Sequence, residues 1–373
     1  MNCFKINFFG DFLSKHSIPT IEDDIKECLD NADYNVINFE APIKTDNYPS
    51  LKSGPAHNQS AEGAGWLRSQ GFNVFTLANN HIMDFGVQGL QTTLKTFKDC
   101  DTIGAGTWDN AYRPLVLEKN GVKVALLSLT HCEFGTLTDR YDKREKSQFG
   151  TAWINHPMVD GLIVKLKKEV DYVIVISHAG IENIEQPLPE WRERYRSLID
   201  LGSSAVIAHH PHIVQGYEEY NGKPIFYSLG NFFFPKDTKK KEFWYHSLAV
   251  NLQFTKDRIA YNFKPLVFDN QTIKIDESDY SRDYMKRISI VLKDEKQYIS
   301  YVNRECVKLR SFYDYMFYAS GYFPLNLPRL WKRFLYLPYR LKKKKPTHLL
   351  NNLRCESHRW AISRAIKIEN NLQ

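Results

Sequence analysis

The sequence lacks three features that would place the protein in a specialised class. Its six cysteines include no pair at the CxxC spacing of a zinc ribbon, and they form no pattern typical of a disulfide framework. No apolar run approaches the roughly 18 residues that a membrane-spanning helix needs. The first apolar stretch ends at Asp11, too early for a signal-peptide core. We therefore expect a cytoplasmic protein from a reducing compartment, without a signal peptide or transmembrane helix.

Excess basic charge is also missing from most of the chain. The 373 residues include 50 Lys and Arg against 43 Asp and Glu, but residues 327–345 hold eight of the bases and no acid. Without those eight, 42 bases face 43 acids, so the body of the protein is close to neutral. No nucleic-acid-reading motif accompanies the charge, and we do not expect a nucleic-acid partner.

The basic segment has a helical pattern. Apolar residues recur at helical spacing from Leu327 to Leu335, with bases on the opposite side and four lysines further on. Such a segment suits an anionic membrane surface, and the alternative is a helix packed on the rest of the protein with a solvated lysine tail. The residues that we assign to membrane binding are Trp331, Lys332, Arg333, Lys342, Lys343, Lys344 and Lys345.

Short strand-like runs alternate with helical patterns as far as residue 268, which predicts an α/β layered domain. The predicted strands are 4–9, 35–39, 73–77, 122–129, 172–177, 205–208 and 225–228. The predicted helices are 21–29, 61–70, 87–97, 159–169 and 190–201. Strand-like alternation over 246–268, with no helix between, indicates that part of the sheet is antiparallel. The Tyr-rich helical texture that follows divides the chain into a domain of 1–275 and a helical, basic C-terminal appendage of 276–373.

Polar side chains follow several predicted strands at the point where each strand ends. They are Asp11, Glu40, Asn79, Asn80, His81, His178, His209, His210, His212 and Asn231. In an open α/β sheet the ligand crevice lies at the carboxyl ends of the strands, so these residues are expected to converge. Carboxylate, amide and imidazole groups bind zinc, manganese or iron. We therefore predict a site for one or two divalent metal ions.

Each of these residues also has a structural interpretation. Asp11 can be a turn acid or helix cap, Glu40 a surface charge, and His81 a buried histidine with its own hydrogen bonds. Three histidines within 209–212 are harder to explain in this way. The structural interpretation requires that several unrelated polar residues occur at strand ends by coincidence, whereas a single metal site accounts for all of them.

The motifs at these strand ends resemble the bacterial capsule-synthesis CapA family. They read GD at 10–11, NFEAP at 38–42, ANNHIMDFG at 78–86, HAGIE at 178–182, HHPH at 209–212 and YSLGNF at 227–232. The resemblance covers residues 4–234. The family is named for poly-γ-glutamate capsule production and belongs to the calcineurin-like metallophosphoesterase superfamily. It implies a four-layer α/β/β/α metallophosphoesterase-like sandwich with a metal centre, usually binuclear, at the strand ends.

The resemblance also implies roles for the residues that match its motifs. The implied metal ligands are Asp11, Glu40, Asn80, His178, His210 and His212. His81 takes the place of the group beside the leaving oxygen, and Asp84 and Glu182 are candidates for orienting histidines or handling a proton. We assign Asn79, His209 and Asn231 to the substrate side of the pocket. The superfamily has a histidine two residues after the first aspartate, where this chain has Leu13, so one metal subsite lacks a ligand.

Together these inferences predict a metal-dependent hydrolase of bacterial capsule or cell-surface polymer metabolism, acting on a phosphoester. A divalent metal lowers the pKa of a bound water toward about 7 and polarises a phosphoryl or acyl oxygen. The expected partners are a phosphorylated or polymeric envelope substrate, the capsule-synthesis machinery and the inner face of an anionic membrane. Two alternatives stay open: a noncatalytic assembly factor that binds a polymer or synthase, favoured by Leu13, and an amide hydrolase acting on a γ-linked peptide.

Overall fold

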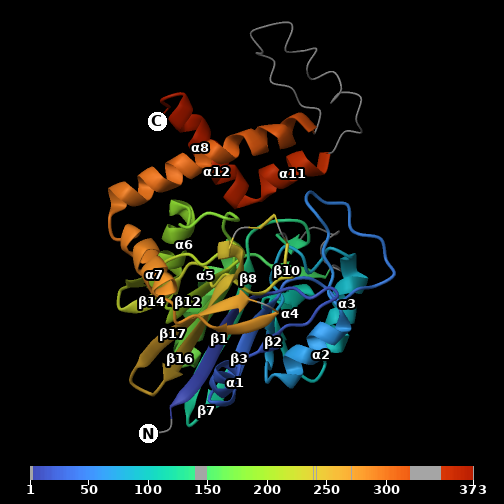
Figure 1. The fold of residues 1–373 in the computed structure, drawn as a ribbon, viewed down its shortest axis with the longest axis vertical. Coiled ribbons are helices and arrows are strands. Elements are labelled where there is room, and N and C mark those ends of the chain that lie inside the picture. The colour runs from blue at the N-terminus through green and yellow to red at the C-terminus, as the bar shows by residue number, and fades with distance from the viewer. Residues whose placement is uncertain are drawn as a thin grey trace, which may run out of the picture.

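The computed structural model describes residues 3–138, 149–237, 239–240, 242–269, 271–319 and 346–372. The residues assigned to membrane binding, Trp331 to Arg333 and Lys342 to Lys345, lie outside this part of the chain. Two large sheets face each other, and helices cover their outer faces (Figure 1). In the described ranges no helix is both long and apolar enough to cross a membrane.

The first sheet has nine strands, with β1 (Phe4–Phe12) near its centre. On one side of β1 lie the parallel strands β3 (Tyr34–Phe39), β4 (Val74–Thr76) and β5 (Asp101–Ile103). On the other side lie β16 (His246–Phe254), β17 (Ile259–Asp269), β18 (Thr272–Ile275) and β2 (Thr20–Ile21), and β15 (Asn231–Phe233) pairs with the end of β1. Because β16 and β17 are antiparallel, the prediction for residues 246–268 is confirmed.

The second sheet has six strands and is parallel at its centre. Its strands are, in spatial order, β13 (Tyr217–Tyr220), β14 (Lys223–Phe226), β12 (Ala205–His209), β11 (Tyr172–His178), β8 (Val122–Thr130) and β7 (Leu115–Lys119). The two edge strands pair antiparallel with their neighbours. A small third sheet joins β6 (Ala105–Gly106), β10 (Gly150–Ala152) and β9 (Thr136–Leu137).

Apolar side chains fill the space between the two large sheets. Alternate residues of β1, Phe4, Ile6 and Phe8, belong to one buried cluster with Ile174 and Ile207 of the facing sheet. Residues at alternate positions of a strand lie on the same face, so one face of β1 supplies this core. A second core lies beneath α1 (Asp23–Asp30), α2 (Ala61–Ser69) and α3 (Gly86–Thr96). A third lies beneath α5 (Pro157–Glu169) and α6 (Pro189–Leu201), which completes the predicted α/β/β/α sandwich. Two short elements, α4 (Trp108–Ala111) and the 3₁₀ helix Glu242–Tyr245, lie in connections.

Three strands run further than predicted, and each carries a candidate site residue in its extended part. β1, β11 and β12 extend to Phe12, His178 and His209, so the site residues are the ends of the strands themselves. The predicted strand 225–228 was too long, because β14 ends at Phe226. The chain turns directly afterwards, where Gly230 has a φ of 70° and its N–H donates to the Ser228 hydroxyl.

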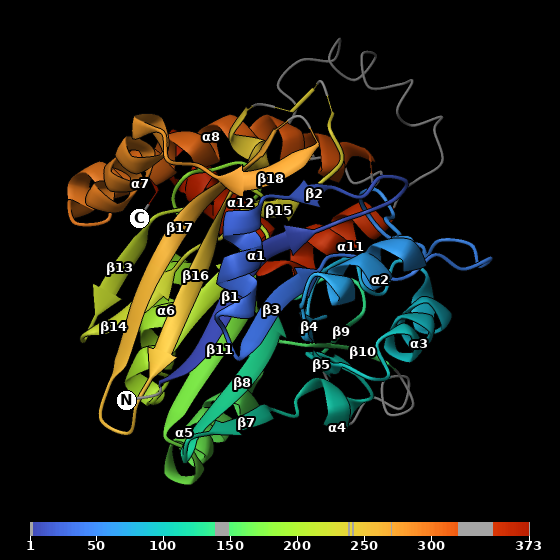
Figure 2. The same cartoon turned by 60° about the horizontal axis from the view of Figure 1, so that its bottom comes forward.

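Within the described part of the chain, four helices follow the last strand. They are α7 (Asp279–Val291), α8 (Glu295–Ala319), α11 (Pro346–Arg354) and α12 (Glu356–Glu369). Figures 1 and 2 show α8, α11 and α12 lying across the carboxyl ends of the strands. Tyr298 of α8 and Ala361 of α12 share an apolar cluster with Trp191 of α6. The helical C-terminal region therefore covers the rim that holds the candidate site, and the division of the chain at residue 276 stays a prediction.

Candidate metal centre

Neighbouring parallel strands bring the predicted ligands together at one rim. Asp11 of β1 is the register partner of Asn38 in β3, and Glu40 follows that strand directly. In the second sheet His178 of β11 pairs in register with His209 of β12. The parallel register thus places residues far apart in sequence at the same level, as the sequence predicted.

Three of the predicted ligands form a compact, fully buried group. One ligand atom each from Asp11, Glu40 and His178 lies within 4.8 Å of the others. Glu40 Oε1 is 3.4 Å from His178 Nε2, and it has no hydrogen-bond partner among the residues that the structure describes. Two buried carboxyl groups beside an imidazole are a donor set that fits a divalent metal, and the unpartnered Glu40 oxygen is free to bind one.

The other three predicted ligands border this group. Asn80 Oδ1 lies 3.1 Å from His178 Nε2, and His210 Nδ1 lies 3.2 Å from the same nitrogen. His212 Nδ1 is 3.7 Å from Asp11 Oδ2. All six predicted ligands are thus gathered, and their individual roles stay predictions.

The turn that carries two of the histidines is strained. His210 and His212 have φ values of 95° and 59°, in a region that side chains other than glycine rarely adopt. Strained conformations of this kind persist where the surrounding structure holds them, and they cluster at functional sites. The turn accordingly brings both imidazoles to the rim on either side of Pro211.

Burial and neighbouring charge set the ionisation of the site. Burial would raise the pKa of Asp11, but His209, His178 and His212 together lower it below its ordinary value. Burial and then the charge of Asp11 raise the pKa of Glu40 well above its ordinary value. Burial lowers the pKa of His178 to about 4 and that of His210 well below the ordinary value. Both imidazoles are therefore neutral near pH 7, the form that binds metal ions.

Asn38 is a site residue for which the sequence predicts no role, although it begins the NFEAP motif at 38–42. Its Nδ2 donates to Asp11 Oδ1 at 2.7 Å and also to Glu40 Oε2, so one amide holds both carboxylates. Its Oδ1 accepts from Asn79 Nδ2 at 3.1 Å. Asn38 is fully buried at the end of β3, where alternation could have indicated an inward polar residue. It fixes the two carboxylates relative to each other.

A second polar group lies beside the ligands and contains His81. Asp84 Oδ2 is 2.7 Å from His81 Nδ1, and Lys52 forms an ion pair with the other oxygen of Asp84. Burial and then the charge of Lys52 lower the pKa of His81. Burial raises the pKa of Asp84, but the bond with His81 and the charge of Lys52 leave it below its ordinary value. Asp84 is therefore placed to orient His81, and its role in handling a proton stays a prediction.

Lys52 and His57 lie in an irregular segment for which the sequence predicts no function. The backbone N–H of His57 donates to Asp84 Oδ2 at 2.7 Å. The centroid of the His57 ring lies 4.6 Å from the centroid of the His81 ring. No motif or periodicity marked either residue. Only the tertiary structure brings this segment to the His81–Asp84 pair.

The residues assigned to the substrate side make contacts within the protein. Asn79 accepts from the backbone N–H groups of His81 and Ile82, which holds the turn after β4. Asn231 donates to the backbone oxygens of His212 and Trp244. His209 Nδ1 lies 3.2 Å from Asp11 Oδ1. These contacts give each residue a positioning role, and substrate binding by them stays a prediction.

Glu182 and Leu13 lie outside the group of gathered ligands. Glu182 is exposed and, within the described ranges, has no hydrogen bond to a histidine, so its charge acts on His178 only from a distance. Leu13 is 3% exposed and packs in the apolar core with Phe12 and Phe39. Its position supplies no ligand atom to the rim.

Comparison with known proteins identifies relatives over this part of the chain. The family model described as "Bacterial capsule synthesis protein PGA_cap" matches residues 6–236, which confirms the resemblance noted in the sequence. The PGA biosynthesis protein CapA of Bacillus subtilis (strain 168) is 34% identical over 208 residues, 54% of this chain and 53% of that protein. The capsule biosynthesis protein CapA of Bacillus anthracis is 32% identical over 241 residues, 61% of this chain and 55% of that protein. The chain thus spans about half the length of these curated relatives.

The solved structures to which this chain is similar are more distant in sequence. A putative 5'-nucleotidase from Staphylococcus aureus, solved in complex with alpha-ketoglutarate, is 12% identical, with a TM-score of 0.46. The alignment covers 77% of this chain and 58% of that one.

Proposed function

The chain belongs to the bacterial capsule synthesis protein family PGA_cap, and on this premise we propose that it is a metal-dependent hydrolase of cell-surface polymer metabolism. The bond that we propose it cleaves is a phosphoester. The observation that supports this most strongly is the buried group of Asp11, Glu40 and His178 beside the oriented pair of His81 and Asp84. Hydrolysis of a phosphoester can use both groups: the cation polarises a phosphoryl oxygen, and the oriented imidazole transfers a proton.

We assign metal binding to the residues whose donor atoms converge. Asp11, Glu40 and His178 would hold the ion, with Asn80, His210 and His212 bordering it. A divalent ion bound there supplies positive charge that polarises a phosphoryl oxygen and acidifies water. Asn38 holds the two carboxylates in place by donating to both of them. Manganese, zinc and iron are all compatible with these nitrogen and oxygen donors.

His81 is the residue to which we assign proton handling. Because Asp84 lies 2.7 Å from Nδ1, that nitrogen carries a proton toward the carboxylate and Nε2 is left to face a substrate. Burial favours the neutral ring, so Nε2 takes up a proton from solvent only when a negatively charged substrate arrives beside it. His81 then returns that proton to a departing oxygen. Lys52 keeps Asp84 ionised during this exchange.

The proposed substrate is a phosphorylated or polymeric component of the cell envelope, handled together with the capsule-synthesis machinery. The names of the two Bacillus relatives and the family description support this class. For residues 327–345 we propose contact with the inner face of an anionic membrane, on the basis of their charge pattern. Flotation with anionic liposomes tests this contact, and equal flotation of the full chain and of a variant with Lys342 to Lys345 replaced by glutamine contradicts it.

A hydrolysis assay tests the proposed activity. The purified chain, supplied with manganese or zinc, is assayed on a phosphomonoester, a phosphodiester and a γ-glutamyl peptide. We expect phosphoester hydrolysis that is lost in His210→Ala and Asn80→Ala and kept in His16→Ala, which changes an exposed histidine. Cleavage of the γ-glutamyl peptide alone would instead favour the amide hydrolase.

A noncatalytic assembly factor is the second candidate, and Leu13 favours it. Its side chain lies in the apolar core where the superfamily pattern has a histidine ligand, so one metal subsite is reduced. Such a factor would bind polymer or synthase through the same rim. Metal binding without hydrolysis of any of the three substrates, together with loss of cellular capsule production in His210→Ala, would favour this candidate.

A further inference from the structure

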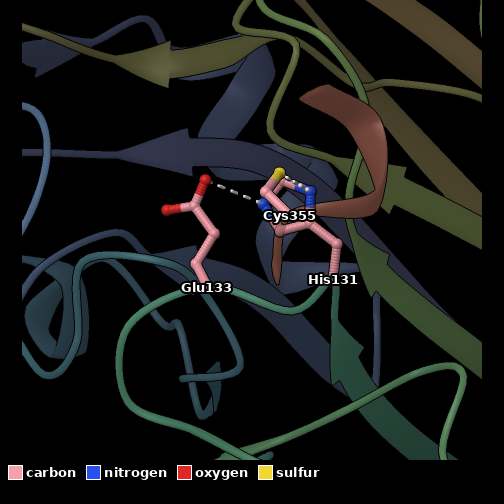
Figure 3. Close-up of side chains that lie close together, drawn as sticks. All are labelled: His131, Glu133 and Cys355. Carbon is pink, nitrogen blue, oxygen red and sulfur yellow. Dashed lines mark hydrogen bonds and ion pairs between the residues drawn. The ribbon is translucent and has the colours of Figure 1, made fainter. Parts of the chain in front are cut away.

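A second group of potential metal ligands lies next to the first group, where the C-terminal helices meet the strand ends. His131 and Glu133 follow β8, and Cys355 lies between α11 and α12. Figure 3 shows the three side chains pointing toward one another from these separate segments. One ligand atom from each lies within 4.8 Å of the others, and all three residues are buried. The metal assigned above does not use any of them.

The spacing of these atoms is close to that of a metal site. His131 Nε2 lies 3.7 Å from Glu133 Oε1, and with one ligand atom taken from each residue the three atoms all lie within 4.8 Å of one another. Cys355 Sγ also lies 3.9 Å from the other ring nitrogen, His131 Nδ1. Ligand atoms at ~2.0–2.3 Å from a tetrahedral ion are roughly 3.3–3.8 Å apart. Small side-chain movements therefore suffice to bring the three donors around one ion.

His131 supplies an independent indication of a ligand. Its Nδ1 lies 3.1 Å from the Ser357 hydroxyl, which fixes the ring, while its fully buried Nε2 has no hydrogen-bond partner within the described part of the chain. A buried polar atom without a partner is costly unless something binds it. The unpartnered nitrogen faces Glu133, on the same side as the proposed ion.

The chain around Cys355 is held firmly in place. The Glu356 carboxylate accepts from the backbone N–H of Cys132 at 2.7 Å and also from the Trp153 indole. The Ser357 hydroxyl accepts from the Trp191 indole at 2.8 Å. These buried contacts place Cys355 opposite His131 before any ion arrives, and a pre-organised site costs less to fill.

We propose that His131, Glu133 and Cys355 bind a zinc ion that is separate from the metal held by Asp11, Glu40 and His178. A thiolate, an imidazole and a carboxylate form a donor set that zinc accepts, whereas manganese disfavours the thiolate. The His131 ring centroid lies 4.5 Å from that of His210, so this ion links the α11–α12 junction to the rim of the first centre. Its role is to fasten the C-terminal helices over the site.

Cobalt substitution tests the proposal on the full chain without reference to activity. A thiolate bound to cobalt gives a near-ultraviolet charge-transfer band, which nitrogen and oxygen ligands do not give. We expect the band in the wild type and in the double variant Asp11→Asn/His178→Ala, which disables the first centre. We expect its loss in Cys355→Ser and its retention in Cys306→Ser, which changes another buried cysteine of the C-terminal helices. Persistence of the band in Cys355→Ser would overturn the proposal.

Zinc-edge X-ray absorption of the wild type keeps the test independent of how the variants fold. Zinc-saturated protein should show one sulfur neighbour at ~2.3 Å for every two zinc ions, or for each ion if only this site fills. Absence of a sulfur neighbour in zinc-saturated protein contradicts the proposal. Because that result leaves zinc at the first centre unaffected, it does not bear on the proposed hydrolase.

Discussion

The Asn38 side-chain amide donates to Asp11 Oδ1 at 2.7 Å, and the same nitrogen also donates to Glu40. One uncharged residue thus fixes the two carboxylates that the proposed metal needs. Groups that orient metal ligands typically change metal affinity by about 10- to 100-fold when they are removed.

The first prediction follows from this contact. Asn38→Ala should weaken binding of zinc or manganese by about 10- to 100-fold, measured by competition with a chromophoric chelator. Asn35→Ala is a matched control, because Asn35 is a buried asparagine of the same strand that bonds to Asn7 instead. The control should lower stability and leave metal affinity unchanged. Equal metal affinity of Asn38→Ala and the wild type would contradict this assignment.

The second prediction concerns Gly10, where two strands approach closely. A Cβ on this residue would lie 2.1 Å from the backbone oxygen of Gly230, at the pairing of β1 with β15. Gly10→Ala should therefore destabilise the fold by about 1–3 kcal/mol and displace Asp11, with weaker metal binding. Thermal denaturation with and without metal measures both effects.

Gly65→Ala provides a control of opposite sign. Gly65 lies within α2, and a Cβ there meets nothing within 4 Å. Because alanine favours a helix over glycine, this variant should be more stable by about 0.5–1 kcal/mol. If the free energy of unfolding of Gly10→Ala equalled that of Gly65→Ala, the close approach of the two strands would not explain why residue 10 is glycine.

The third prediction concerns the His81–Asp84 pair. His81→Gln should lower kcat by about 10²–10⁴-fold with a smaller effect on KM, because proton transfer affects the chemical step. Asp84→Asn should lower kcat as well, since the amide is uncharged and has only one acceptor oxygen for the two contacts that Asp84 makes with His81 and Lys52. Steady-state kinetics on the phosphoester identified in the assay measure both. A change confined to KM would assign the pair to substrate binding.

The fourth prediction concerns the pH dependence of stability far from the metal centre. Glu218 accepts hydrogen bonds from Arg192 and Arg196, and these outweigh burial to lower its pKa to about 2. A carboxyl with a depressed folded-state pKa stabilises the fold above its unfolded-state pKa, near 4.5, and this contribution is lost as pH falls toward 2.

Glu218→Gln should therefore remove part of the acid-induced loss of stability between about pH 4.5 and 2, as measured by urea denaturation at several pH values. Glu219→Gln is the control, because its carboxylate accepts from Tyr261 instead. An identical pH profile for the wild type and Glu218→Gln would show that the arginine contacts do not stabilise the ionised form.

The sequence predicted the layered fold and the convergence of ligands, because both follow from local patterns. Buried strands with Asp11, His178 and His209 at or next to their last residue are readable from apolar runs and parallel register. The antiparallel strands at 246–268 were readable from alternation without an intervening helix.

The remaining site residues depend on long-range packing. Lys52 lies in an irregular segment, and Cys355 lies between two helices more than 200 residues after His131. Neither has a periodic context that relates it to the rim. The ends of short strands were also harder to predict, as at Phe226, because the apolar pattern continues into Tyr227 although the strand does not.

The measurement that tests the central claim most directly is anomalous diffraction from crystals of the full chain equilibrated with zinc. We predict an anomalous peak at ~2.0–2.2 Å from a carboxylate oxygen of Asp11 or Glu40 and from a ring nitrogen of His178. A site between these three residues that stays empty at saturating zinc, with the side chains placed as described, would contradict the account.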